Sequence, residues 1–125
     1  NSRRGNGGLP ETIGRMKQCE IWYADLNPVR GSEQQGFRPV VIISGNMLNQ
    51  YLKTVIACPL TTKIKGYKGN IILKPTVKNG LLKDSEILIF HIRSISKERL
   101  IRKIGNISKV QLDELKQGLD DILRY

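Results

Sequence analysis

Arg38 and Thr61 are two residues whose types and positions could do chemistry together. Arg38 stands where a polar loop, residues 31–36 with a glycine at each end, becomes an apolar strand, and Thr61 directly follows another apolar run. Functional side chains are often carried on loops anchored by a rigid scaffold, and arginine binds phosphate through two parallel hydrogen bonds. Arg38 is therefore a candidate phosphate ligand. The alternative is an ordinary ion pair, here with Glu33.

The two residues meet if the strands expected at 39–44 and 54–60 are antiparallel neighbours, as consecutive strands often are. The start of one strand then abuts the end of the next, and the loops 31–37 and 62–68 flank the shared edge. Arginine, lysine and hydroxyl groups contact phosphates, and aromatic rings stack on unpaired bases. The edge thus has the composition of a single-stranded RNA groove, gathering Glu33, Gln34, Phe37, Arg38, Thr61, Thr62, Lys63, Lys65, Tyr67 and Lys68.

Other hydrolytic chemistries are disfavoured by counting residues. His91 is the one histidine, so a two-histidine ribonuclease centre cannot form, and the acidic residues are scattered without a spacing suited to two metals. Phosphate-loop, GxSxG and CxxC patterns are absent from the sequence. RNA carries its own nucleophile, the 2′-hydroxyl, which a protein need only align while stabilising charge on the phosphorus. We expect neither metal nor cofactor.

Length and charge indicate one basic domain. The chain has 125 residues, 39% of them hydrophobic, and a net charge of +10, which favours polyanions such as nucleic acid, although an acidic protein or an anionic membrane surface would also fit. Its apolar runs fall well short of the roughly 18 residues that suggest a membrane span. Cys19 and Cys58 share no metal-ligand spacing and are expected to be free thiols in a reducing cytoplasm.

Residues 1–15 have no apolar period. They contain four glycines and a proline. We expect them to be a flexible leader that was added for recombinant expression, before a native start at Met16. Without them the domain at 16–125 keeps 18 basic and 10 acidic residues, so the basic excess belongs to the domain.

Short strands dominate the pattern. Strands are expected at 19–26, 39–44, 54–60, 70–74, 85–91 with a continuation to 94, and 101–107; a helical turn is expected within 46–53 and a capped turn at 96–100. Pro59 predicts an edge or a bulge because proline has no N–H to donate to a ladder. Ser108 with Gln111 forms a capping box for a final helix whose apolar face holds Leu112, Leu115, Leu119, Ile122 and Leu123. The fold expected is a small, strongly bent antiparallel β-barrel with a C-terminal α-helix packed on it.

These residues carry a family resemblance. From Met16 to its end the chain resembles the MazF/PemK toxins of bacterial type II toxin–antitoxin systems, through GSEQ at 31–34 followed by RPV at 38–40, PLTT at 59–62 with KGY at 65–67, and IRSI at 92–95. The resemblance implies a barrel of the MazF/PemK–CcdB toxin type and a cytoplasmic homodimer. It implies an mRNA interferase, a metal-independent, sequence-specific endoribonuclease that leaves 2′,3′-cyclic phosphate and 5′-hydroxyl ends. It also implies inhibition by an acidic MazE-like antitoxin.

The resemblance assigns the catalytic arginine to Arg38 and the catalytic threonine to Thr61. Arginine is effectively always protonated, so Arg38 is expected chiefly to stabilise charge on the phosphorane. Thr61 is expected to hydrogen-bond the scissile phosphate, and the alternative is an ordinary strand-end cap. Glu33 either orients Arg38 or accepts the 2′-hydroxyl proton, and the alternative is a purely structural anchor of the loop. Ser32 and Gln34 are expected to shape the loop or touch RNA, and Lys63, Lys65 and Lys68 to steer its backbone. His91 stands where relatives commonly carry glutamine, and is either an RNA contact or a strand-end histidine.

Two other function classes fit a barrel of this kind. One is a non-enzymatic gyrase poison like CcdB, which acts through a C-terminal helix with a tryptophan near its end; here Trp22 lies in the first expected strand and the chain ends Leu123-Arg124-Tyr125. The other is a barrel that binds RNA without cutting it. RNA cleavage by pure protein in a chelator separates both from the nuclease.

Overall fold

The computed structural model describes residues 16–28 and 36–125, which form a mainly β fold. The elements, in chain order, are β1 (Glu20–Asp25), β2 (Phe37–Ile42), α2 (Asn46–Tyr51), β3 (Thr54–Thr61), β4 (Ile71–Leu73), β5 (Ser85–Ile87), the 3-10 turn η3 (Ile89–His91), β6 (Arg93–Ser96), the 3-10 turn η4 (Lys97–Arg99), β7 (Leu100–Asn106) and α3 (Lys109–Arg124).

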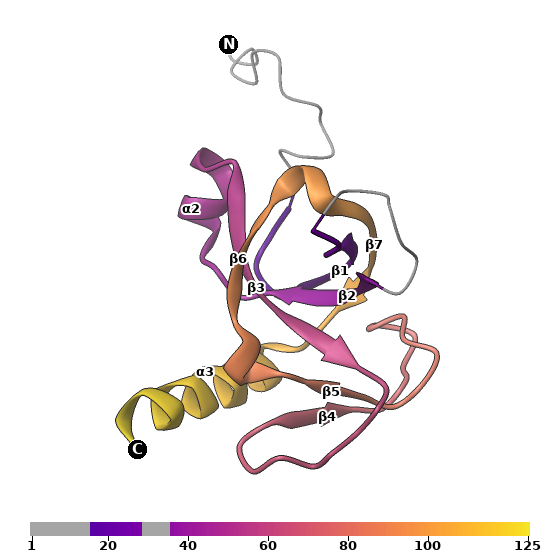
Figure 1. The fold of residues 1–125 in the computed structure, drawn as a ribbon, viewed down its shortest axis with the longest axis vertical. Coiled ribbons are helices and arrows are strands. Elements are labelled where there is room, and N and C mark those ends of the chain that lie inside the picture. Colours follow the sequence, from indigo (N-terminus) through magenta and orange to yellow (C-terminus); the bar gives the residue numbers. More distant parts are fainter. Residues whose placement is uncertain (1–15, 29–35) are drawn as a thin grey trace.

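The strands form one curled antiparallel sheet, a half-barrel with α3 at one side (Figure 1). The strand order is β4-β5-β3-β2-β1-β7, and β6 pairs with β3 as well. The first half of β3 pairs with β6, from Thr54 to Ala57, and its last two residues pair with β5. Pro59 lies in the gap between these two ladders. At this point β3 changes its partner from β6 to β5, whereas an edge or a bulge was expected. The expected fold class is confirmed.

The strand expected at 85–91, with its continuation to 94, is wrong. The structure divides this segment into β5, η3 and β6. Two turn hydrogen bonds interrupt the extended chain, from His91 N–H to the Leu88 carbonyl and from Ile92 N–H to the Ile89 carbonyl, both 3.1 Å. The turn lets one segment pair with both ends of β3, which curls the sheet.

The second strand begins two residues earlier than expected. β2 spans Phe37–Ile42, because β1 continues to pair through Ala24 opposite Arg38 and Asp25 opposite Phe37. Arg38 thus lies inside a strand rather than before it. The helical turn expected within 46–53 is confirmed as α2, and the capped turn at 96–100 as η4, where the Ser96 hydroxyl accepts from the Glu98 N–H.

Alternating side chains give the sheet an apolar cluster on each face. One cluster, represented by Ile21, Val41 and Leu60, packs against α3, and the other, represented by Trp22, Val40 and Ile95, fills the opposite face. Burial of both faces explains why β2 is apolar without alternation. The two clusters fix the strands on which Arg38 and Thr61 stand.

The closing helix α3 begins as predicted. The Ser108 hydroxyl accepts from the Gln111 N–H, and the Gln111 side chain accepts from the Ser108 N–H. Leu112 and Leu115 are fully buried and Leu119 packs against their cluster. The last turn departs from the expectation, since Ile122 is 45% and Leu123 79% exposed. The packed face therefore covers the first part of the helix, because the sheet does not reach its end (Figure 1).

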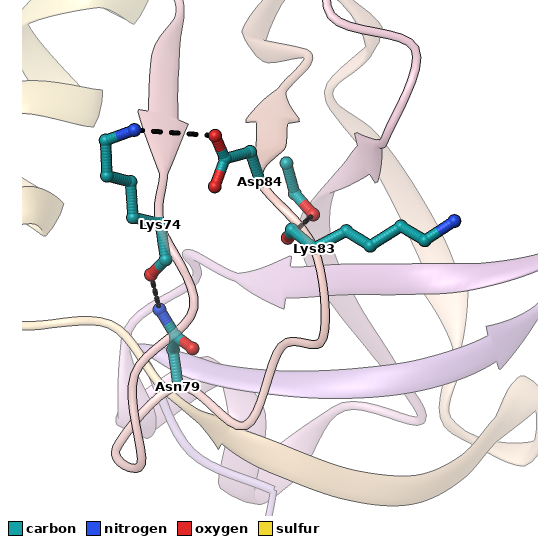
Figure 2. A network of polar contacts seen from close by, with 5 residues as sticks. Lys74, Asn79, Lys83 and Asp84 are labelled. Carbon is teal, nitrogen blue, oxygen red and sulfur yellow. Dashed lines mark hydrogen bonds and ion pairs between the residues drawn. The ribbon is translucent and has the colours of Figure 1, made fainter.

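The long connection between β4 and β5 is closed by Asn79. Its side-chain oxygen accepts from the N–H groups of Thr76 and Leu81, and its amide donates to the Lys74 carbonyl at 2.9 Å. Lys74 also reaches across to Asp84 at 3.4 Å (Figure 2). Gly80 has a positive φ of 68°, and a Cβ there would meet the Ile104 carbonyl of β7. These contacts hold the connection against β7.

The two cysteines are free thiols, as expected. Burial raises the pKa of the Cys58 thiol to about 12, and burial also raises the pKa of Cys19, although Lys109 and Lys116 counter it. Neither is therefore set up as a thiolate nucleophile. Within 16–28 and 36–125, no helix combines the length and the apolar character needed to cross a membrane.

Candidate active site

The pairing of β2 with β3 brings Arg38 and Thr61 together. Val40 lies opposite Pro59 and Val41 opposite Cys58 in this antiparallel ladder. Continuing the register two residues toward the start of β2 places Arg38 opposite Thr61. The expectation that both lie at one edge of the sheet is confirmed, and we call this pair the rim.

A hollow of about 260 Å³ opens at the rim. Arg38 and Thr61 both line it, so one phosphate group could contact the two side chains at once. The residues around this hollow, called the Thr61 hollow below, are Phe37, Arg38, Pro39, Leu60, Thr61, Thr62, Lys63 and Ser85.

Arg38 also lines a second hollow, of about 290 Å³. Arg38 therefore lies between the two hollows. There its guanidinium could contact a phosphate while the nucleotides on the two sides of that phosphate lie in the hollows. The residues around this second one, called the His91 hollow below, are Leu26, Gly36, Arg38, Pro59, Leu88, His91 and Arg93.

The Thr61 hydroxyl has a defined orientation. Its oxygen accepts a hydrogen bond from the Lys63 N–H at 3.1 Å, which closes a small turn at the end of β3. A threonine hydroxyl that accepts in this way still carries one proton to donate. Thr61 can therefore present a donor to a phosphate oxygen in the hollow.

The remaining predicted site residues fall into three groups. Ser32, Glu33 and Gln34 lie outside the described residues. Phe37 lines the Thr61 hollow and packs edge-on against Tyr23, with ring centroids 6.0 Å apart. The exposed connection between β3 and β4 carries the rest of the loop residues, which are Thr62, Lys63, Lys65, Tyr67 and Lys68.

Three residues at or near the hollows were missed in the sequence. Arg93 lines the His91 hollow, and Phe90 packs against His91 with ring centroids 4.6 Å apart. Glu86 is fully buried beneath the loop that carries Tyr67. Glu86 directly precedes the apolar run Ile87-Leu88-Ile89, and this position is a signal for such a role because an acidic side chain is rarely buried without partners.

The environment of Glu86 favours its charged form. Burial alone would raise the pKa of this carboxyl, but hydrogen bonds from the Asn70 amide and the N–H groups of Lys65, Gly66 and Tyr67 outweigh burial and hold the pKa below its usual range. Glu86 therefore carries a negative charge at neutral pH. Its four donors satisfy the carboxylate inside the protein, so it is suited to positioning the loop rather than to contacting substrate.

Acidic, histidine and cysteine side chains stay apart in the described part of the chain. Across 16–28 and 36–125, no three of them gather in an arrangement that could hold a metal ion. The chemistry available at the rim is that of a cation and a hydroxyl acting on an anionic group.

Sequence comparison relates this site to a known family. The family of PemK-like, MazF-like toxins of type II toxin–antitoxin systems matches residues 17–123. The chain is 38% identical over 107 residues to endoribonuclease MazF of Staphylococcus saprophyticus, covering 84% of this chain and 88% of that protein. It is 35% identical over 105 residues to endoribonuclease EndoA of Bacillus subtilis, covering 83% and 90%.

Solved structures share the fold. MazF from Deinococcus radiodurans superposes with a TM-score of 0.72 at 24% identity, covering 88% of this chain and 97% of that one. A MazE–MazF complex from the same organism gives 0.69 at 21% identity, covering 86% and 94%. With the family matching nearly the whole described domain, the chain belongs to the PemK-like, MazF-like toxins of type II toxin–antitoxin systems.

Proposed function

We propose that this protein is an endoribonuclease toxin that cuts single-stranded RNA, mRNA above all, at specific sequences and without a metal ion. The observation that carries the proposal is the shared hollow of Arg38 and Thr61 at the ends of paired strands. The names of the relatives support it, since those from Staphylococcus saprophyticus and Bacillus subtilis are endoribonucleases.

The proposed reaction is an attack of the ribose 2′-oxygen on the adjacent phosphorus. A bond forms between that oxygen and phosphorus while the bond to the 5′-oxygen breaks, which leaves a 2′,3′-cyclic phosphate and a 5′-hydroxyl. The guanidinium of Arg38 stabilises the charge that builds on the phosphorane, and Thr61 donates a hydrogen bond to a phosphate oxygen. The 2′-hydroxyl loses its proton as it attacks, and the leaving 5′-oxygen gains one.

Proton transfer has two candidate groups. Glu33 either accepts the 2′-hydroxyl proton itself or orients Arg38 while water accepts that proton, and Arg38 or water delivers a proton to the leaving oxygen. Ser32 and Gln34 are proposed to touch the RNA or shape the loop beside Glu33. His91 is proposed as an RNA contact, supported by its place in the same hollow as Arg38.

Positive charge around the rim supports the choice of RNA as substrate. Lys63, Lys65 and Lys68 are exposed on the connection that follows Thr61, within a chain of net charge +10. Such lysines contact phosphates and release counterions on binding, so cleavage of limiting RNA should weaken as salt increases.

We propose that the toxin is a homodimer that a cognate acidic antitoxin inhibits in the bacterial cytoplasm. An exposed apolar surface supports the dimer. It consists of Met47, Leu48 and Tyr51 of α2, Leu52 directly after the helix, and Ile56 of β3, the strand that α2 contacts. The free thiols of both cysteines fit a reducing compartment. The complex of MazF with MazE from Deinococcus radiodurans supports the antitoxin as partner.

The test is incubation of pure protein with a mixed pool of unstructured RNA in excess EDTA, followed by sequencing of the 5′-hydroxyl ends. We expect cleavage at one short motif, and no cleavage of a DNA–RNA chimera whose scissile nucleotide lacks the 2′-hydroxyl. Cleavage of that chimera would contradict 2′-hydroxyl attack. RNA binding without any products would instead indicate a barrel that binds RNA and does not cut it.

A further inference from the structure

Three aromatic rings form a row beside the His91 hollow. Tyr67 lies edge-on to Phe90 with ring centroids 5.3 Å apart and planes at 88°, and Phe90 is followed by the His91 ring at 4.6 Å. Tyr67 is 50% and Phe90 46% exposed, so each keeps a large area open to solvent. Because His91 lines the hollow with Arg38, the row begins at the candidate active site and leads away from it.

Glu86 fixes the Tyr67 end of this row. One carboxylate oxygen accepts from the N–H groups of Lys65 at 2.8 Å and Gly66 at 3.2 Å, and the other accepts from the Tyr67 N–H at 3.0 Å. Three consecutive backbone donors thus converge on one buried carboxylate. Glu86 itself lies opposite Thr61 in the ladder between β3 and β5, so the loop is tied to the strand that carries the rim.

Asn70 links the same carboxylate to the Phe90 end. Its amide nitrogen donates to Glu86 at 3.0 Å, and its amide oxygen accepts from the N–H of Ile89, the residue before Phe90, at 3.3 Å. The buried Glu86 and the half-buried Asn70 therefore set the backbone under both rings. We call Glu86, Asn70 and the three N–H groups of residues 65–67 the Glu86 hub.

Packing behind the hub limits movement of the loop. Gly66 and Gly69 have positive φ values of 69° and 93°, which glycine adopts without strain. A Cβ on Gly118 of α3 would approach the Gly69 carbonyl and the Ile89 side chain to 2.8 Å each. Glycine at 118 thus lets the helix pack closely on the loop and η3, which brings these segments side by side near α3 in Figure 1.

Exposed rings held rigidly among lysines suit an unpaired base. Base stacking on an aromatic side chain needs little reorganisation when the ring is already fixed, and Lys63, Lys65 and Lys68 can contact the flanking phosphates. An apolar protein partner would fit this positive surface less well than a polyanion.

We propose that Tyr67 and Phe90 form a stacking subsite for an unpaired RNA base outside the scissile dinucleotide, and that Glu86 and Asn70 are its positioning residues. This inference rests on the proposed function, and it adds to it a binding position that the rim alone does not supply. The subsite increases substrate affinity and contributes to sequence choice, whereas the rim performs the reaction.

The test uses a short RNA that contains the motif found by end sequencing, together with versions in which single nucleotides flanking the cut are abasic. For the wild type we expect one abasic position to lower kcat/KM by about 5- to 100-fold, the range typical of one stacked base. Phe90→Leu and Tyr67→Leu should raise KM on the intact RNA to a similar degree with kcat unchanged. In these variants the same abasic position should lower kcat/KM little further, because the stacking is already lost.

Tyr125→Leu is the matched control, because Tyr125 is an exposed tyrosine at the far end of α3 and should leave every rate unchanged. Glu86→Gln should reproduce the rise in KM without loss of kcat. Should that variant fail to fold, the two exposed-ring variants decide the question alone.

Wild-type rates for both ring variants, or an abasic penalty that persists in them undiminished, would overturn the subsite. A wild type that cleaves none of these RNAs overturns the proposed function, and the subsite with it, while wild-type cleavage with unaffected ring variants rejects the subsite alone.

Discussion

The rim and the Glu86 hub are neighbours, since Thr61 pairs with Glu86 in the ladder between β3 and β5, but they differ in how their polar groups are satisfied. Thr61 and Arg38 are half-buried in a hollow large enough for substrate groups. Glu86 is fully buried, and four donors from its own chain surround its carboxylate. A group satisfied internally can hold other atoms in place, whereas reaction requires groups that can turn their hydrogen bonds to substrate.

The difference should separate two kinds of variant. Changes at the rim should remove activity and leave stability almost unchanged. Changes in the hub should lower stability and substrate affinity while the reaction itself continues.

The largest effect is expected for Arg38→Ala. Loss of the charge that stabilises the phosphorane should lower the cleavage rate by about 10³-fold. The free energy of unfolding should change by no more than about 0.5 kcal/mol, since Arg38 is not part of either apolar cluster. Single-turnover cleavage and urea unfolding measure the two quantities.

Arg124→Ala provides the control for Arg38→Ala. Arg124 forms an exposed ion pair with Asp120 on α3 and should be silent in both assays. Full activity of Arg38→Ala would remove that residue from the mechanism.

A smaller, opposite pattern is expected for Glu86→Gln. The NH₂ group of a glutamine at this position would face backbone N–H groups that now donate hydrogen bonds to the carboxylate. Some of these donors would therefore lose their acceptor. We expect a loss of about 1–3 kcal/mol in the free energy of unfolding, with kcat unchanged. Urea unfolding measures this loss, and Glu114→Gln, on the exposed face of α3, is the matched control.

A stability equal to that of the wild type would show that the hub contributes little to the fold. A loss of kcat with unchanged stability would place Glu86 with the rim instead.

The pH dependence of stability gives the smallest effect. The pKa of Glu86 is lowered in the folded protein, so its contribution is fully present above the ordinary glutamate pKa of about 4.3 and is lost as pH falls through the lower folded value. The stability difference between wild type and Glu86→Gln should therefore shrink on acidification. Urea unfolding at a series of acidic pH values measures it, and a difference that grows would contradict the charged hub.

The sequence alone predicted that the residues of the rim lie together, but it did not predict the Glu86 hub, and the reason is physical. Strand order and antiparallel pairing place Arg38 beside Thr61 from local patterns alone. The hub depends on a loop folding back onto a strand about 20 residues later, as in the bond from the Tyr67 N–H to Glu86, and such a contact leaves no periodic signal.

The fold shows the same division between local and long-range signals. The capping box at Ser108 is local and was predicted correctly. The turn η3 was missed because the apolar pattern of residues 85–91 is that of one continuous strand. The segment is interrupted because β5 pairs with the end of β3 and β6 pairs with its first half. Residues 31–35, which include Glu33, lie outside the described residues, so the role of Glu33 stays a prediction.

The central claim is that Arg38 and Thr61 act on the same phosphate. The most direct measurement is a double-mutant cycle of single-turnover cleavage rates for wild type, Arg38→Lys, Thr61→Val and the double variant. Thr61→Val alone should slow cleavage by about 10- to 100-fold, and the two losses should combine to much less than their product. Losses that multiply in full, or a Thr61→Val enzyme as fast as the wild type, would contradict the claim.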